Sequence, residues 1–180
     1  MSDTSIAIVP RISSYPERKE KADEILAWLS GQGIVEKEPS DCILGPGLGY
    51  AMGSKAEQAV NDGSFLPVGL YTNGLEIVLE RQVFHTGQFG LETLECPGCK
   101  ENISAEDWEF LSEWASGESD NLTCPLCGVA AEIHSYKFEP TWGFSDLGFI
   151  FWNWPDFRTS FIEDFKRLLN CEIDLVVSKV

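Results

Sequence analysis

The sequence predicts an α+β fold, and three observations lead to this class. The chain begins with a short apolar strand, a helical segment and a second strand, and it ends with an aromatic strand, a helical segment and a closing strand. Between these halves lies a segment with four cysteines in two close pairs. Strand and helix patterns in this order favour a sandwich of split β-α-β type, similar to a ferredoxin-like fold, with the cysteine segment inserted midway.

The first strand and helix are predicted from the opening of the chain. The apolar run 6–9 ends at Pro10, which suits a strand. Ser14 and Glu17 have the spacing of a capping box, and apolar residues follow at helical intervals as far as Gly31. A glycine at that position is a common helix stop.

Turn signals dominate the next part of the chain. Three short apolar runs are candidate strands: 34–35, 42–44 and 65–71. The glycine-rich stretch 45–55 reads as a loop. Asn73-Gly74 is a hairpin signal in front of the alternating run 75–84, which we expect to be a strand.

The last part of the chain repeats the strand and helix pattern. Residues 129–138 look extended, and the aromatic run 148–155 suits a strand. Asp156 is placed to cap a helix that shares one apolar face and ends at Asn170. A closing strand follows, with four residues expected on one side: Cys171, Ile173, Leu175 and Val177.

The aromatic run itself has two interpretations. Ile150, Trp152 and Trp154 alternate with two phenylalanines, so a strand would put them on one face. The first interpretation is core packing. The second is that Trp152 and Trp154 are exposed and anchor a protein partner, because tryptophans are frequent among the residues that contribute most to binding at interfaces.

Composition bounds the class of protein. The chain has 180 residues, enough for one main domain, and its 43% hydrophobic and 12% aromatic content excludes a disordered chain. No apolar run approaches the roughly 20 residues of a membrane helix, and the N-terminus does not have the pattern of a secretory leader. We therefore expect a cytoplasmic protein whose thiols stay reduced.

The cysteine pattern predicts a metal site. Cys96 and Cys99 form one Cys-x-x-Cys turn, and Cys124 and Cys127 form another. Each such turn can point two sulfurs at one ion, and two turns complete the tetrahedral shell of a structural zinc. Four thiolates leave no open position for a catalytic water, so we expect one structural Zn²⁺ per chain. A disulfide pair and a redox dithiol are the alternatives.

The spacer between the two turns is predicted to contain a helix. It has 24 residues, slightly more than the roughly 15–20 usual for paired Cys-x-x-Cys sites. Ser104 and Asp107 have capping-box spacing, and Trp108, Leu111 and Ala115 follow at helical intervals. His134, seven residues after the last cysteine, is interpreted as a polar strand residue and not as a fifth ligand.

The sequences Cys96-Pro-Gly-Cys99 and Cys124-Pro-Leu-Cys127-Gly resemble the two knuckles of a zinc ribbon. The resemblance covers residues 94–138 and implies metal binding without a particular function, since zinc ribbons occur in nucleic-acid binders, in enzymes and in interaction modules. The rest of the chain is similar to small uncharacterised bacterial proteins. We expect a main α+β domain of residues 1–93 and 139–180 with a ribbon inserted at 94–138.

Charge indicates the kind of partner. The chain carries a net charge of −16, and residues 92–132 contain ten carboxylates against one base, Lys100, which gives −9 before any metal is bound. Such a surface repels nucleic acid and attracts a basic protein. Plain solubility is the alternative explanation. Four carboxylates on or near the predicted helix are candidate interaction residues: Glu106, Asp107, Glu109 and Glu113.

Three functions are compatible with these observations. The first is a non-catalytic cytoplasmic zinc protein that acts through protein–protein contacts, in one version an acidic neutraliser of a basic partner, as small immunity proteins are. The second is an enzyme that uses the ribbon only for stability, with a cleft near the loop 45–53. The third is a nucleic-acid-binding ribbon, which the negative charge disfavours. No membrane partner is expected.

Overall fold

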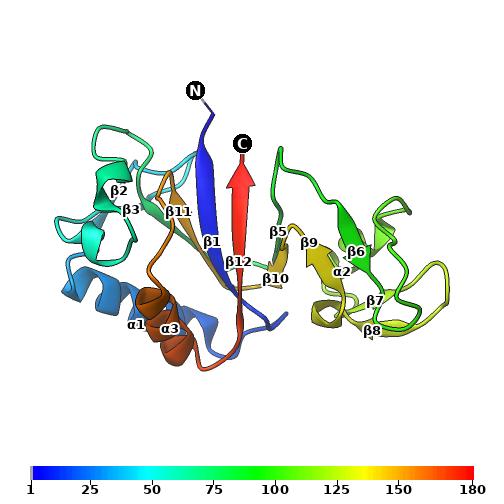
Figure 1. Ribbon diagram of the computed structural model, residues 1–180. Helices are drawn as coiled ribbons and strands as arrows, with labels where there is room; N and C mark the ends of the chain where they lie inside the picture. Colours follow the sequence, from blue (N-terminus) through cyan, green and yellow to red (C-terminus); the bar gives the residue numbers. More distant parts are fainter. Residues whose placement is uncertain (1) are drawn as a thin grey trace.

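The computed structural model describes residues 2–180. Within them the chain forms three α-helices, a six-stranded antiparallel sheet and three two-stranded sheets, so the expected α+β class is confirmed. Figure 1 shows two lobes side by side: the main sheet with its helices, and a smaller lobe that contains the two Cys-x-x-Cys turns. We call the smaller part, residues 82–145, the cysteine lobe.

The main sheet is built around β1 (Thr4–Pro10), which pairs with strands from the end of the chain. Its strand order is β12-β1-β11-β4-β3-β2. The other five strands are β2 (Val35–Ser40), β3 (Gly49–Met52), β4 (Leu75–Val78), β11 (Gly148–Trp152) and β12 (Ile173–Lys179). A split β-α-β sandwich has four strands and this sheet has six, so the ferredoxin-like topology is not shown.

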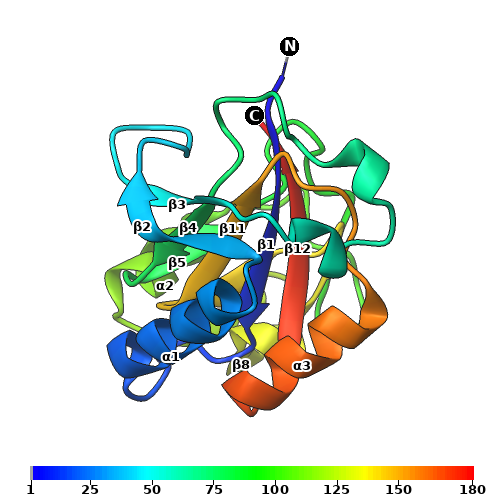
Figure 2. The same cartoon turned by 90° about the vertical axis from the view of Figure 1, so that its left-hand side faces the viewer.

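Two helices, α1 (Arg18–Gly31) and α3 (Thr159–Leu169), cover one face of the main sheet (Figure 2). Side chains on β1 alternate, so Ile6 and Ile8 pack under the helices while Ala7 and Val9 face the other side. Trp28 of α1 stacks on Phe161 of α3 with ring centroids 5.6 Å apart. The main core therefore lies between this sheet face and the helix pair.

The cysteine lobe has a separate core. Its elements are β5 (Gln82–Phe84), β6 (Thr93–Glu95), α2 (Glu109–Ser116), β7 (Asn121–Thr123), β8 (Ala130–Glu132), β9 (Lys137–Glu139) and β10 (Gly143–Ser145), with the 3-10 helix η3 (Ile133–Ser135). Leu94, Trp114 and Leu122 are fully buried in this core. Trp142 and Phe144 join the same core, which therefore reaches past residue 138.

Several predicted strands are wrong, and the reason is tertiary contact. Residues 42–44 and 65–71 are not strands; the first has no regular structure and the second begins with the last residue of a 3-10 helix, η2 (Gly63–Phe65). The predicted loop 45–55 contains β3 and is followed by the 3-10 helix η1 (Ala56–Gln58). A Cβ atom at Gly49 would lie 2.6 Å from the Leu75 carbonyl oxygen, so this glycine permits close strand pairing and does not mark a loop.

The predicted hairpin turn at Asn73-Gly74 and the single strand 75–84 after it are also wrong. The run 75–84 breaks into β4 and β5, which belong to different sheets. Strand β4 pairs with β3, which ends more than 20 residues earlier in the chain. The two strands are therefore not joined by the two-residue turn that a hairpin at Asn73-Gly74 requires. A Cβ at Gly74 would sit 2.2 Å from the Cys42 sulfur, so the glycine is needed for backbone approach.

Helix starts differ from the predictions, whereas two helix ends agree, since α1 ends at Gly31 and α3 ends before Asn170. Glu17 adopts a left-handed conformation (φ 51°) and α1 begins after it with no side-chain cap. Helix α2 likewise begins at Glu109 without the predicted capping box, and α3 begins at Thr159 with no cap from Asp156. Asn170 ends α3 in the left-handed conformation, as expected.

Two extended segments also differ from the predictions. Residues 129–138 are interrupted by η3 and form parts of β8 and β9. In the closing strand β12, Val176 is the buried residue, while Leu175 and Val177 are exposed. The strand lies at the sheet edge, so the side predicted to be apolar is covered in part: Cys171 and Ile173 pack against the main core, while Leu175 and Val177 do not.

Candidate metal centre

The four cysteines of the paired turns meet at one point of the cysteine lobe. Their sulfur atoms all lie within 4.8 Å of one another. The Cys96 and Cys127 sulfurs are 3.8 Å apart, and those of Cys99 and Cys124 are 3.9 Å apart. A tetrahedron with metal–sulfur bonds of about 2.3 Å has sulfur–sulfur edges of about 3.8 Å. The four-cysteine group can therefore hold one metal ion.

The two turns have the same backbone hydrogen bonds. In the first, the Lys100 N–H donates to the Cys96 carbonyl (3.0 Å) and the Cys96 N–H donates to the Glu101 carbonyl (3.1 Å). In the second, the Gly128 N–H donates to the Cys124 carbonyl (2.9 Å), and the Cys124 N–H donates to Val129 (2.8 Å). The fifth residue of each turn has a positive φ angle, 64° at Lys100 and 75° at Gly128. Each turn thus aims two sulfurs in one direction by local geometry.

The surroundings of the Cys96 sulfur favour a thiolate, whereas hydrogen bonding with the other three thiols helps to raise the pKa of Cys99 to about 11 when no metal is bound. Burial opposes ionisation of Cys96, but hydrogen bonds from the Cys99 and Gly98 N–H groups outweigh it and lower the pKa of the thiol to about 7. The Gly98 nitrogen lies 3.3 Å from the Cys96 sulfur. Thiolates are the metal-binding form of cysteine, and four of them with tetrahedral spacing suit zinc best among common metals.

The group is rigidly supported on its inner side. Cys96 and Cys124 are buried, and Cys127 is exposed. The Tyr136 hydroxyl donates to the Leu122 carbonyl (2.8 Å), and burial beside the cysteines raises the pKa of this phenol. Asn102 accepts from the Leu94 N–H (3.0 Å) and so holds the strand that leads into the first turn.

The four candidate interaction carboxylates are all exposed. Three of them, Asp107, Glu109 and Glu113, line one hollow of about 230 Å³ on α2 and the second cysteine turn. Its apolar lining includes Ile103, Phe110 and Pro125. Glu106 lies outside that lining.

The two candidate anchor tryptophans are buried. Trp152 is 7% exposed and lies on the sheet face opposite the helices, while Trp154 is 4% exposed and packs in the main core. They face different sides of the sheet because the strand ends at Trp152 and Asn153 has a positive φ angle of 63°. The positions favour core packing, the first of the two interpretations of the aromatic run.

Residues without any sequence motif connect the cysteine lobe to the main sheet. Arg81, between β4 and β5, donates to the Ser119 carbonyl (3.2 Å) and stacks over the Trp114 ring at 4.2 Å. The Trp114 indole N–H donates to the Ser13 hydroxyl (3.0 Å). An arginine between two short strands gives no local pattern, so sequence reasoning missed it.

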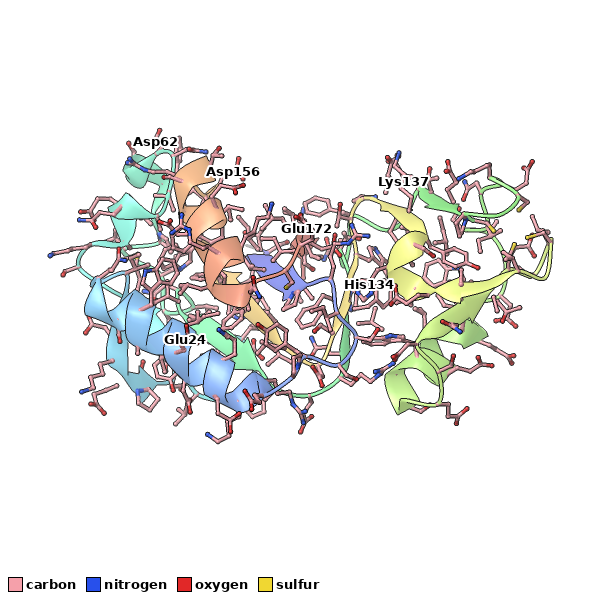
Figure 3. All side chains as sticks on the ribbon, turned by 90° about the horizontal axis from the view of Figure 1, so that it is seen from below. Glu24, Asp62, His134, Lys137, Asp156 and Glu172 are labelled. Atoms are coloured by element: carbon pink, nitrogen blue, oxygen red, sulfur yellow. The ribbon has the colours of Figure 1, made fainter. Side chains whose placement is uncertain are left out.

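His134 belongs to the same junction and not to the cysteine group. Figure 3 shows it on the side of the lobe that faces the main sheet. Its Nδ1 lies 2.6 Å from a Glu132 carboxylate oxygen and its Nε2 lies 2.8 Å from the Phe144 carbonyl. These two contacts hold the imidazole inside the cysteine lobe, between η3 and β10. The backbone carbonyl of His134 accepts from Arg11 of the main lobe and so makes the link across the junction. The residue lies in η3, where the prediction was a polar strand residue.

Comparison with known protein families, curated proteins and solved structures finds no match. Within residues 2–180, no helix combines the length and the apolar character that crossing a membrane requires. The function must therefore be argued from the site and the surface of this chain.

Proposed function

We propose that this chain is a non-catalytic zinc protein that binds a basic protein partner through the acidic surface of its cysteine lobe. The observation that carries the proposal is the hollow in which three carboxylates surround an apolar lining, next to a cysteine turn. A lysine or arginine side chain has the complementary form, an apolar stem with a charged head.

The metal supports this role by fixing the surface. Four sulfurs complete a tetrahedral shell, so the ion has no open position for a substrate or an activated water. The arrangement is of zinc-ribbon type, with one Zn²⁺ per chain. Because Pro125 of the second turn lines the hollow, the metal holds one wall of the proposed binding surface in place.

The net charge supports the class of partner. A chain of −16 attracts basic proteins over long range and repels nucleic acid. A basic toxin or nucleic-acid enzyme neutralised by this chain is the specific version of the proposal. Neither the enzyme nor the nucleic-acid alternative has an observation in its favour as specific as the acid-lined hollow.

The proposal is tested with a partner captured from the native cell and identified by mass spectrometry. The association rate should fall steeply as salt is added, with a smaller change in the dissociation rate. The variant Glu106→Gln, Asp107→Asn, Glu109→Gln, Glu113→Gln should slow association at least several-fold at low salt while keeping one zinc per chain by elemental analysis.

A matched variant separates local from overall charge. Replacing Glu20, Glu36, Glu38 and Glu57 by glutamine removes the same four charges from exposed positions of the main lobe. It should slow association clearly less than the first variant. Equal effects of both variants, or equally strong binding of an unrelated basic protein, would mean that only net charge matters. Tight, salt-sensitive binding of duplex DNA or RNA would contradict the proposal.

A further inference from the structure

The sheet face opposite α1 and α3 contains a hollow of about 300 Å³ that has no part in the proposed function. Two neighbouring rows of paired residues form its floor. In one row Ala7 lies between Val176 and Ile150, and Ile150 pairs with Glu76. In the other row Ser5 lies between Ser178 and Trp152.

Small side chains on β1, which lies between β12 and β11, leave room for the hollow. Ser5 and Ala7 are buried but fill little volume, whereas Ile6 and Ile8 on the same strand point to the helices. The walls rise around this floor from the other segments. They come from Gln82, Val83, Phe84 and His85 on and after β5, with Leu44 and Val180 at the rim.

Glu76 is the one carboxylate in the lining, and no lysine or arginine lines the hollow. The Trp152 indole N–H donates to Oε2 of this carboxylate at 2.9 Å. That bond fixes the orientation of the carboxylate and uses one of its two oxygens. The hollow thus combines an oriented negative charge with the aromatic side chains of Trp152 and Phe84.

We propose that this hollow binds a small organic cation, an ammonium group carried on an apolar or aromatic body. The carboxylate accepts a hydrogen bond from the ammonium, and the indole adds a cation–π contact. The floor of Ala7, Ile150 and Val176 covers the apolar body. The volume lies at the lower end of the range for small-ligand pockets, which limits the ligand to a compact molecule.

The proposal is independent of the zinc and of the basic protein partner. The floor of the hollow lies on the main sheet and one wall, residues 82–85, belongs to the cysteine lobe, but no cysteine of the metal group lines it. Leu44 at its rim directly precedes the stretch 45–53, where the sequence suggested a cleft. A ligand bound in this hollow would therefore lie next to residues 45–53, and the proposal gives those residues no catalytic role.

Three probes of similar size test the charge preference. Phenethylamine, 2-phenylethanol and phenylacetate are titrated into the ¹⁵N-labelled full chain, and the tryptophan indole cross-peaks are followed by NMR. We expect saturable shifts of the Trp152 indole and of the Ser5 and Ser178 amides with phenethylamine. The alcohol should bind about tenfold more weakly, since one charged hydrogen bond is lost, and phenylacetate should not bind.

Two variants locate the effect. Glu76→Gln keeps an oxygen for the Trp152 indole but removes the charge, so the preference for the amine over the alcohol should disappear. Glu80→Gln is the control, because Glu80 is exposed beyond the end of the same strand and does not line the hollow. Equal affinity of the wild type for amine and alcohol overturns the proposal without any variant. So do shifts that map elsewhere, absence of saturable binding, or an unchanged preference in a folded Glu76→Gln chain.

Discussion

Replacing Arg81 by methionine tests whether a single side chain joins the cysteine lobe to the main sheet. The guanidinium donates to the carbonyls of Trp114 and Ser119, pairs with Asp120 and stacks over the Trp114 ring. The side chain is only 16% exposed, so solvent screens these contacts weakly. Methionine keeps an apolar stem of similar length and removes every polar contact.

The expected loss follows from those contacts. A hydrogen bond from a charged donor contributes about 1.5 kcal/mol at the low end of its range, and Arg81 makes two to carbonyls. The low end applies because the Trp114 carbonyl also accepts from the Gly117 N–H. The cation–π contact adds about 0.5–1 kcal/mol. We therefore expect Arg81→Met to lower the free energy of unfolding by about 3.5–4 kcal/mol.

Urea unfolding of the zinc-loaded chain measures this change, with Arg167→Met as the matched control. Arg167 is 74% exposed and pairs only with Asp164 three residues earlier on α3, so its loss should stay within about 0.5 kcal/mol. Hydrogen exchange should show the loss for Arg81→Met first in α2 and β7. A change below about 1 kcal/mol, or one no larger than the control, would refute this assignment of the contacts.

Two further predictions concern the metal and the pH dependence. Chelation of the metal should lower hydrogen-exchange protection across the cysteine lobe, while α1, α3 and the main sheet stay protected. The reason is that zinc binding contributes about 10 kcal/mol or more to the folding of such modules, and the main core is separate from the core of the lobe. Uniform loss of protection across the chain would contradict this prediction. Burial raises the pKa of Asp174 from its usual 3.8, although Arg11 and His134 oppose the rise. A raised native pKa gives stability that is fully present below pH 3.8 and lost as the pH rises through the native value. As the pH rises from 3.8 through the native pKa, the wild type should therefore lose unfolding free energy relative to Asp174→Asn, which does not titrate. A difference between the two that does not change with pH would exclude the effect.

The sequence determined the features whose physics is local. The two Cys-x-x-Cys turns identify the four sulfurs, since a tight turn of four residues fixes the direction of both ligands whatever the rest of the fold does. Asn170 marks the end of α3 for a similar reason, because asparagine tolerates the left-handed conformation. The order of strand and helix patterns also indicated the α+β class, and the charge of residues 92–132 pointed to the acidic surface around α2.

Only the tertiary structure decided which strands pair and which side chains meet. Gly49 and Gly74 stand in sequences typical of turns. The structure shows another reason for glycine, because backbone and sulfur atoms of distant residues occupy the space that a Cβ would need. The capping boxes at α1 and α2 matched in spacing and did not form.

The contacts that join the lobes and shape the hollow have the same origin. Trp114 reaches Ser13 across 101 residues, and Trp152 reaches Glu76 across 76. Spacing along the chain carries no record of such pairs, because their energy comes from burial and hydrogen bonding between segments that approach only after the sheet has assembled.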